Sequence, residues 1–131
     1  MNRYISEKLA ISGLILILSL VIVFHSLIIT GIIPFDIVWG GRLKSAGQMR
    51  LYESISIILN LVMLFMVMAK AGILNPGIGE KAYAYFFRLM SLLFFLNTIG
   101  NILSKNDLER MIFTPLTFIL CIFFLRLSTS K

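Results

Sequence analysis

The chain has little of what most catalytic and metal sites are built from. Its 131 residues include one cysteine, Cys121, and one histidine, His25. A single cysteine excludes an intrachain disulfide and a dithiol redox pair, and no cysteine, aspartate or glutamate neighbours His25 at the spacing of a metal-binding motif. The sequence also has no zinc motif and no nucleophile elbow. We therefore expect no cofactor, no metal and no enzymatic activity.

Charge is also scarce. Only 14% of the residues are charged, and 59% are hydrophobic. A water-soluble domain needs a charged shell around its core, and this chain has too few charges to form one. The net charge is +6, but the lysines and arginines lie at the ends of apolar runs rather than in one patch. That placement is typical of membrane helices and argues against a nucleic-acid partner.

What the sequence does contain is four long apolar runs separated by short charged breaks. A helix needs about 20 residues to cross a bilayer, because each residue advances it by about 1.5 Å. The runs predict membrane spans at about 9–33, 52–74, 82–104 and 109–127. The first is too long for a signal peptide and lacks an A-x-A-like cleavage site. We predict an all-α protein, an integral membrane antiparallel four-helix bundle that forms a single transmembrane domain over residues 1–131.

Local signals predict where some helices begin and end. Pro34 has no amide hydrogen, so we expect the first helix to stop or bend there. Ser45 with Gln48 resembles a capping box and predicts the start of the second helix. Asn106 is a good N-cap with Glu109 at the N3 position, which predicts the start of the fourth helix near residue 107.

The polar residues inside the apolar runs share helix faces. One stripe each is expected on the second, third and fourth helices, consisting of Glu53, Ser56 and Asn60; Asn97, Asn101 and Ser104; and Arg110, Thr114, Thr117 and Cys121. Because antiparallel helices alternate in direction, these stripes fall in the same half of the bilayer. Polar groups in hydrocarbon are costly, so we expect them to face inward toward a common pocket near the 34–53 and 104–110 loops. The candidate binding residues are Glu53, Asn60, Asn97, Asn101, Arg110 and Arg42.

Each of these residues also has a purely structural interpretation. Amides and hydroxyls often bond between membrane helices, and the heptad spacing of Ser12, Ser19 and Ser26 is compatible with a seam for close packing. Glu53 is a functional candidate because it is ionisable within a bundle. Its structural alternative, which we favour slightly, is an interfacial salt bridge with Arg50, Arg42 or Arg110.

The chain resembles small, uncharacterised bacterial membrane proteins with four spans. The similarity rests on Trp39-Gly40-Gly41-Arg42-Leu43 and Asn97-Thr98-Ile99-Gly100-Asn101, and on Glu109-Arg110 followed by Thr114-Pro115-Leu116-Thr117. It would cover most of the chain, up to Thr117. The resemblance implies a bacterial plasma (inner) membrane, and it implies no catalytic residues and no substrate.

The distribution of basic residues bears on orientation. The side that holds both termini carries six lysines and arginines, and the opposite side carries five: Arg3, Lys8, Lys70, Lys81, Arg126 and Lys131, against Arg42, Lys44, Arg50, Lys105 and Arg110. Because cytoplasmic loops are richer in these residues, the count favours cytoplasmic termini.

Two functions fit these patterns. The first is a non-enzymatic membrane protein that binds or passes a small molecule or lipid in a polar intramembrane pocket. Four short helices enclose little volume, so transport would require a homodimer. The alternative is a structural or accessory subunit that docks to another membrane protein. The partners expected in either case are the lipid bilayer and a second membrane-protein chain.

Overall fold

The structure, a computed structural model, describes residues 5–34, 45–104 and 106–129. These residues form four α-helices and no strand: α1 (Glu7–Ile29), α2 (Ala46–Lys70), α3 (Glu80–Ile102) and α4 (Asp107–Ser128). All four are long and apolar enough to cross a membrane. The all-α prediction is confirmed. The helix boundaries differ from the predicted spans by at most six residues, at the start of α2 (46 against 52).

The predicted N-caps are confirmed. The Ser45 hydroxyl accepts a hydrogen bond from the Gln48 amide at 3.1 Å, and Asn106 Oδ1 accepts one from the Glu109 amide at 3.0 Å. Each bond satisfies one of the amide groups that the first turn of a helix leaves without an intrahelical acceptor. The starts of α2 and α4 are therefore encoded locally.

The prediction that Pro34 ends the first helix is wrong. α1 ends at Ile29, and Gly31 adopts a positive φ of 86°. The amide of Ile32 donates to the Leu27 carbonyl at 3.0 Å, which closes the helix in a Schellman motif. α2 ends in the same way at Gly72, with φ 84°. Glycine takes this left-handed conformation without the steric penalty that other residues meet, so it ends the helix before the proline is reached.

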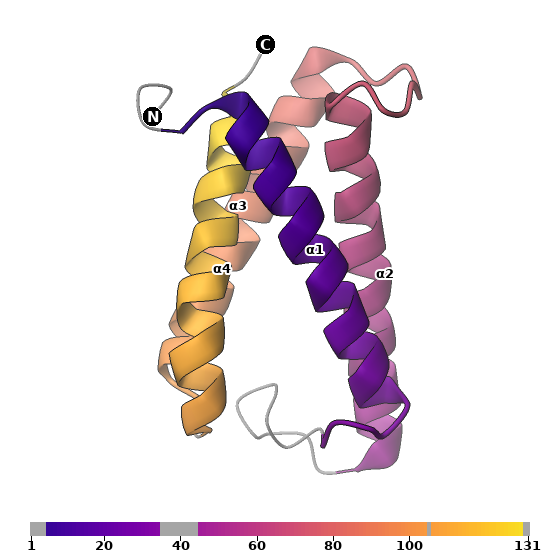
Figure 1. The fold of residues 1–131 in the computed structure, drawn as a ribbon, viewed down its shortest axis with the longest axis vertical. Coiled ribbons are helices and arrows are strands. Elements are labelled where there is room, and N and C mark those ends of the chain that lie inside the picture. Colours follow the sequence, from indigo (N-terminus) through magenta and orange to yellow (C-terminus); the bar gives the residue numbers. More distant parts are fainter. Residues whose placement is uncertain (1–4, 35–44, 105, 130–131) are drawn as a thin grey trace.

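The helices are arranged as two antiparallel hairpins, α1–α2 and α3–α4 (Figure 1). The hairpins lie close together at one end of the molecule and separate toward the other. We call the end where the hairpins lie close together the terminal end; it holds the start of α1, the end of α4 and the 71–79 connection. The end where the hairpins separate is called the pocket end, and it holds the ends of α1 and α3 and the starts of α2 and α4. α1 also contacts α4, whereas α2 and α3 make little contact.

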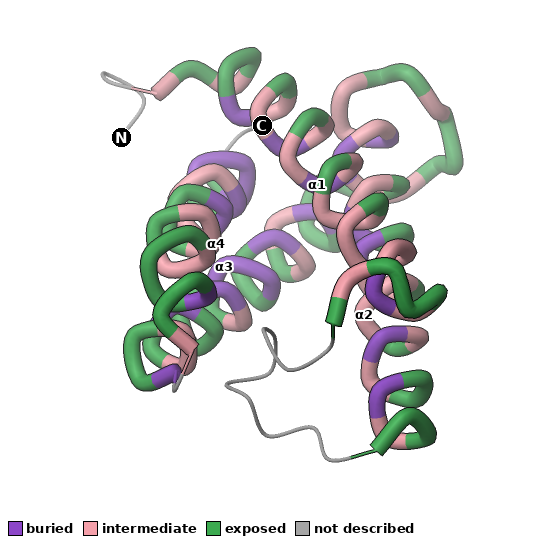
Figure 2. Tube along the Cα trace, turned by 60° about the horizontal axis from the view of Figure 1, so that its bottom comes forward, coloured by how far each residue is buried: buried purple, intermediate pink, exposed green. Residues whose placement is uncertain are grey.

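Aromatic side chains fill the terminal end. Phe124 is fully buried and its ring stacks on Phe87 and Phe94, with centroids 5.9 and 5.7 Å apart. α1 approaches α4 closely at Gly13, where an added Cβ would lie 2.4 Å from the ring of Phe123. Most buried positions lie on the sides of the helices that face the interior of the bundle (Figure 2).

Ser12 and Ser26, two of the three serines in the suggested seam, have different surroundings. Ser12 is exposed, and the hydroxyl of Ser26 donates to the Ile22 carbonyl of its own helix at 2.8 Å. The close approach occurs one residue away from Ser12, at Gly13. One residue turns a helix by about 100°, so neighbouring positions face different directions.

Candidate functional site

A cavity of about 640 Å³ lies between the two hairpins, and all four helices contribute to its wall. This volume is within the range of sites that hold small molecules, roughly 300–1,000 Å³. Its apolar lining includes Ile17, Met63, Leu93 and Leu120. Its polar lining consists of His25, Ser56, Asn60, Asn97, Asn101, Glu109 and Thr117. Among the described lining residues, only His25 and Glu109 are ionisable.

The cavity is not sealed from its surroundings. Leu20, Ile55 and Leu96 all line it, yet they are 60%, 52% and 55% exposed. They come from α1, α2 and α3, and α2 and α3 make little contact. On the α1–α4 side the rings of Phe24 and Phe113 meet edge to face, with centroids 5.1 Å apart. The cavity is therefore open at the level of the helices themselves, and the gap between α2 and α3 lies on one side of it.

Glu53 is fully buried and pairs with His25 across α1 and α2 (Nδ1 to Oε2). The favoured sequence alternative was a salt bridge with Arg50, Arg42 or Arg110, and the structure adds His25 as a partner that this alternative did not include. A buried carboxylate needs such a contact, because its desolvation in an apolar interior is otherwise uncompensated. His25 lines the cavity, while Glu53 lies behind it. Glu53 therefore positions the imidazole.

Asn60 lies furthest along α2 of the residues in the predicted stripe, and it is only 6% exposed. Its Nδ2 donates to the Ser56 carbonyl at 2.7 Å. Its Oδ1 is buried and has no hydrogen-bond partner in the described part of the chain. Asn60 also lines the cavity. Asn60 therefore carries an unsatisfied acceptor that is buried in the cavity wall.

The two asparagines on α3 have different surroundings. Asn101 Nδ2 donates to Thr117 Oγ1 at 3.2 Å and to the Phe113 carbonyl at 3.3 Å. Thr98 Oγ1 also donates to Thr117, at 3.0 Å. These bonds join α3 to α4, as the structural interpretation of the amides expected. Asn97 lines the cavity, as the inward-facing stripe predicted, and its side chain is exposed.

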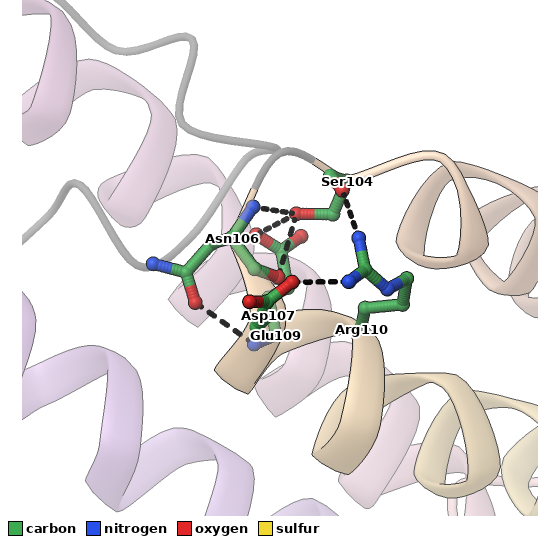
Figure 3. Close-up of polar contacts among 5 residues, drawn as sticks. All are labelled: Ser104, Asn106, Asp107, Glu109 and Arg110. Carbon is green, nitrogen blue, oxygen red and sulfur yellow. Dashed lines mark hydrogen bonds and ion pairs between the residues drawn. The ribbon is translucent and has the colours of Figure 1, made fainter.

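Arg110 belongs to the start of α4 and not to the cavity wall. Its guanidinium donates to the Ser104 carbonyl at 3.1 Å and pairs with Asp107 (Figure 3). In the same cluster the Ser104 hydroxyl donates to Glu109 Oε2 at 3.1 Å. Glu109 is buried and lines the cavity, a position that its capping role alone did not predict. The remaining candidate, Arg42, lies outside the described residues.

The cavity combines an apolar wall with separated polar groups, an arrangement that suits binding. Within residues 5–34, 45–104 and 106–129, no group of three histidine, cysteine, aspartate or glutamate side chains could hold a metal ion. Comparison with protein-family models, with curated proteins and with solved structures finds no match to this chain.

Sequence reasoning missed two features of the site. His25 was not included in any of the predicted polar stripes, yet it contacts Glu53. A solitary histidine near the end of an apolar run, with a glutamate near the start of the next, was the available signal. The Phe24–Phe113 pair had no such signal, because phenylalanine is common in every apolar run of the chain.

Proposed function

We propose that this protein spans a membrane four times as an antiparallel bundle and binds a small molecule or lipid between its hairpins, without catalysing a reaction. The main support for this proposal is Asn60 Oδ1, which is buried without a hydrogen-bond partner in the described part of the chain, in a residue that lines the 640 Å³ cavity. An unsatisfied acceptor in an apolar interior costs about 1–3 kcal/mol. Such a cost is understandable where a ligand supplies the missing donor.

The proposed location is a bacterial plasma membrane with both termini in the cytoplasm. Support for the membrane comes from the length and hydropathy of the helices. The bacterial assignment rests on the sequence resemblance alone, and the orientation rests on six basic residues against five.

Filling the cavity tests the function. Gly100 lines the cavity, and a Cβ added there would meet no heavy atom within 4 Å. Gly100→Phe therefore adds its Cβ without a clash, and we expect its ring to occupy ligand space. Gly47 is equally unobstructed but is exposed in the first turn of α2, away from the cavity wall. Gly47→Phe is the matched control, because it adds the same side chain elsewhere.

The measurement is native mass spectrometry of protein extracted from membranes in a mild detergent. We expect a bound molecule of defined mass on the wild type and on Gly47→Phe, and its loss from Gly100→Phe. Equal retention by all three proteins would place the molecule outside the cavity and refute the proposal. A polypeptide that co-purifies at fixed stoichiometry, with no small molecule bound, would instead favour the accessory-subunit alternative.

A further inference from the structure

We propose that the ligand is an uncharged, membrane-soluble molecule whose hydroxyl or amide N–H donates a hydrogen bond to Asn60. This inference rests on the proposed function, because it names the chemical class of the molecule that the cavity takes. It follows from three properties of the site: the orientation of one amide, its depth, and the side on which the cavity is open.

The orientation of the Asn60 amide determines what the ligand must offer. The bond from Nδ2 to the Ser56 carbonyl assigns the nitrogen end of the side chain. The oxygen end is therefore the one without a partner. Oxygen accepts hydrogen bonds and does not donate them, so the complementary ligand group is a donor. An ether, ester or ketone oxygen would leave Oδ1 unsatisfied.

The depth of Asn60 determines the charge of that group. Asn60 is 14 residues from the start of α2 and 10 from its end, or about 21 and 15 Å along the helix axis. In a helix that crosses a bilayer, this position is near the middle of the hydrocarbon. A charged group is costly at that depth. A neutral hydroxyl or amide satisfies the acceptor without that cost.

The opening of the cavity determines where the ligand comes from. The exposed lining residues Leu20, Ile55 and Leu96 are all apolar. They belong to helices that are apolar enough to span a membrane. A molecule that enters past them comes from the hydrocarbon and keeps its apolar part against these side chains. The inner wall of Met63, Leu93 and Leu120 continues the same apolar surface.

The test uses a photoactivatable dodecan-1-ol that carries a diazirine on its chain, with the protein in phosphatidylcholine nanodiscs. Unlabelled dodecan-1-ol competes in one series, and 1-methoxydodecane, which has no donor, competes in the other at equal mole fractions in the membrane. Labelled peptides are identified by mass spectrometry. We expect labelling of cavity-lining residues and an alcohol that competes about threefold to tenfold better than its ether, the effect of one hydrogen bond.

Two variants test whether Asn60 causes the preference for the alcohol over its ether. Asn60→Leu should bring the ratio of the two competitors to about one while labelling of the cavity continues. Thr114→Val is the control, because Thr114 Oγ1 is the other buried side-chain atom without a partner in the described structure but is not part of the cavity wall. We expect this variant to keep the preference of the wild type.

The contrary outcomes separate the two proposals. If alcohol and ether compete equally in the wild type while labelling stays within the cavity, the inference about the donor is refuted and the binding function stands. The same holds if Asn60→Leu keeps the preference. If labelling falls only on lipid-facing residues such as Leu61 and is unchanged by Gly100→Phe, both proposals are refuted.

Discussion

The two ends of this molecule are built from the same helices, yet they pack in different ways. At the terminal end, phenylalanine rings stack between α3 and α4, and Gly13 lets α1 reach the ring of Phe123. Arg126 donates from Nε to the Ile5 carbonyl at 2.8 Å and holds the start of α1. At the pocket end the hairpins separate, and polar side chains line the space between them.

The closely packed contacts that stabilise the bundle and the candidate site therefore lie in different halves of the molecule. Lipid tails are as apolar as leucine, so membrane helices associate mainly through close packing and hydrogen bonds. The terminal end has close packing. The pocket end has a cavity in place of part of that packing, and polar contacts such as His25–Glu53 join its helices. Changes at the two ends should therefore have unequal effects.

The largest effect is expected from Phe124→Ala. The ring is fully buried and stacks on two others, so its removal leaves a void that its neighbours only partly fill. We expect a loss of about 3 kcal/mol in the free energy of unfolding, the lower end for such changes in protein cores. Phe118→Ala on the same helix is the control, because Phe118 is exposed. Unfolding by sodium dodecyl sulfate in mixed micelles measures both, and equal losses would contradict the comparison.

A smaller effect is expected from Gly13→Val. The added Cβ meets the Phe123 ring at 2.4 Å, so the ring or the two helices must shift. Overpacking of this kind costs about 1–3 kcal/mol. Combining it with Phe123→Ala should relieve the clash, so the double variant loses less stability than the sum of the two single changes. Additive losses in the same unfolding assay would show that the close approach is not tight.

The smallest effect, and one of opposite sign, is expected from Asn60→Leu. The change removes a buried acceptor that has no partner, together with one hydrogen bond to the Ser56 carbonyl. Without ligand, we expect the free energy of unfolding to stay the same or to rise by up to about 1 kcal/mol. A loss above about 1 kcal/mol would mean that Asn60 serves packing, and the contrast between the two ends would weaken.

Prediction from sequence succeeded where the signal was local. The N-caps at Ser45 and Asn106 were predicted correctly because a cap depends on residues within one turn. The prediction failed at the end of α1, because both Gly31 and Pro34 can end a helix and Gly31 comes first along the chain. The burial of Glu53 and Asn60 followed from the cost of polar groups in an apolar interior.

Contacts between helices were harder to predict. The pairing of Glu53 with His25, on a different helix, was not predicted. Asn97 and Asn101 are four residues apart on one stripe, but Asn101 bonds to Thr117 while Asn97 is exposed. The difference arises because α3 packs closely on α4 and leaves a gap toward α2. No pattern within α3 specifies how far away α2 lies.

The number of helices, their starts and their apolar character were determined by the sequence alone, because hydrophobic run length and capping act over a few neighbouring residues. The tertiary structure decided which polar groups meet, where Gly13 allows close approach, and that a cavity opens beside Asn60. Those outcomes depend on the rotation of each helix about its axis and on the angle between the hairpins, which many weak contacts along the whole bundle set together.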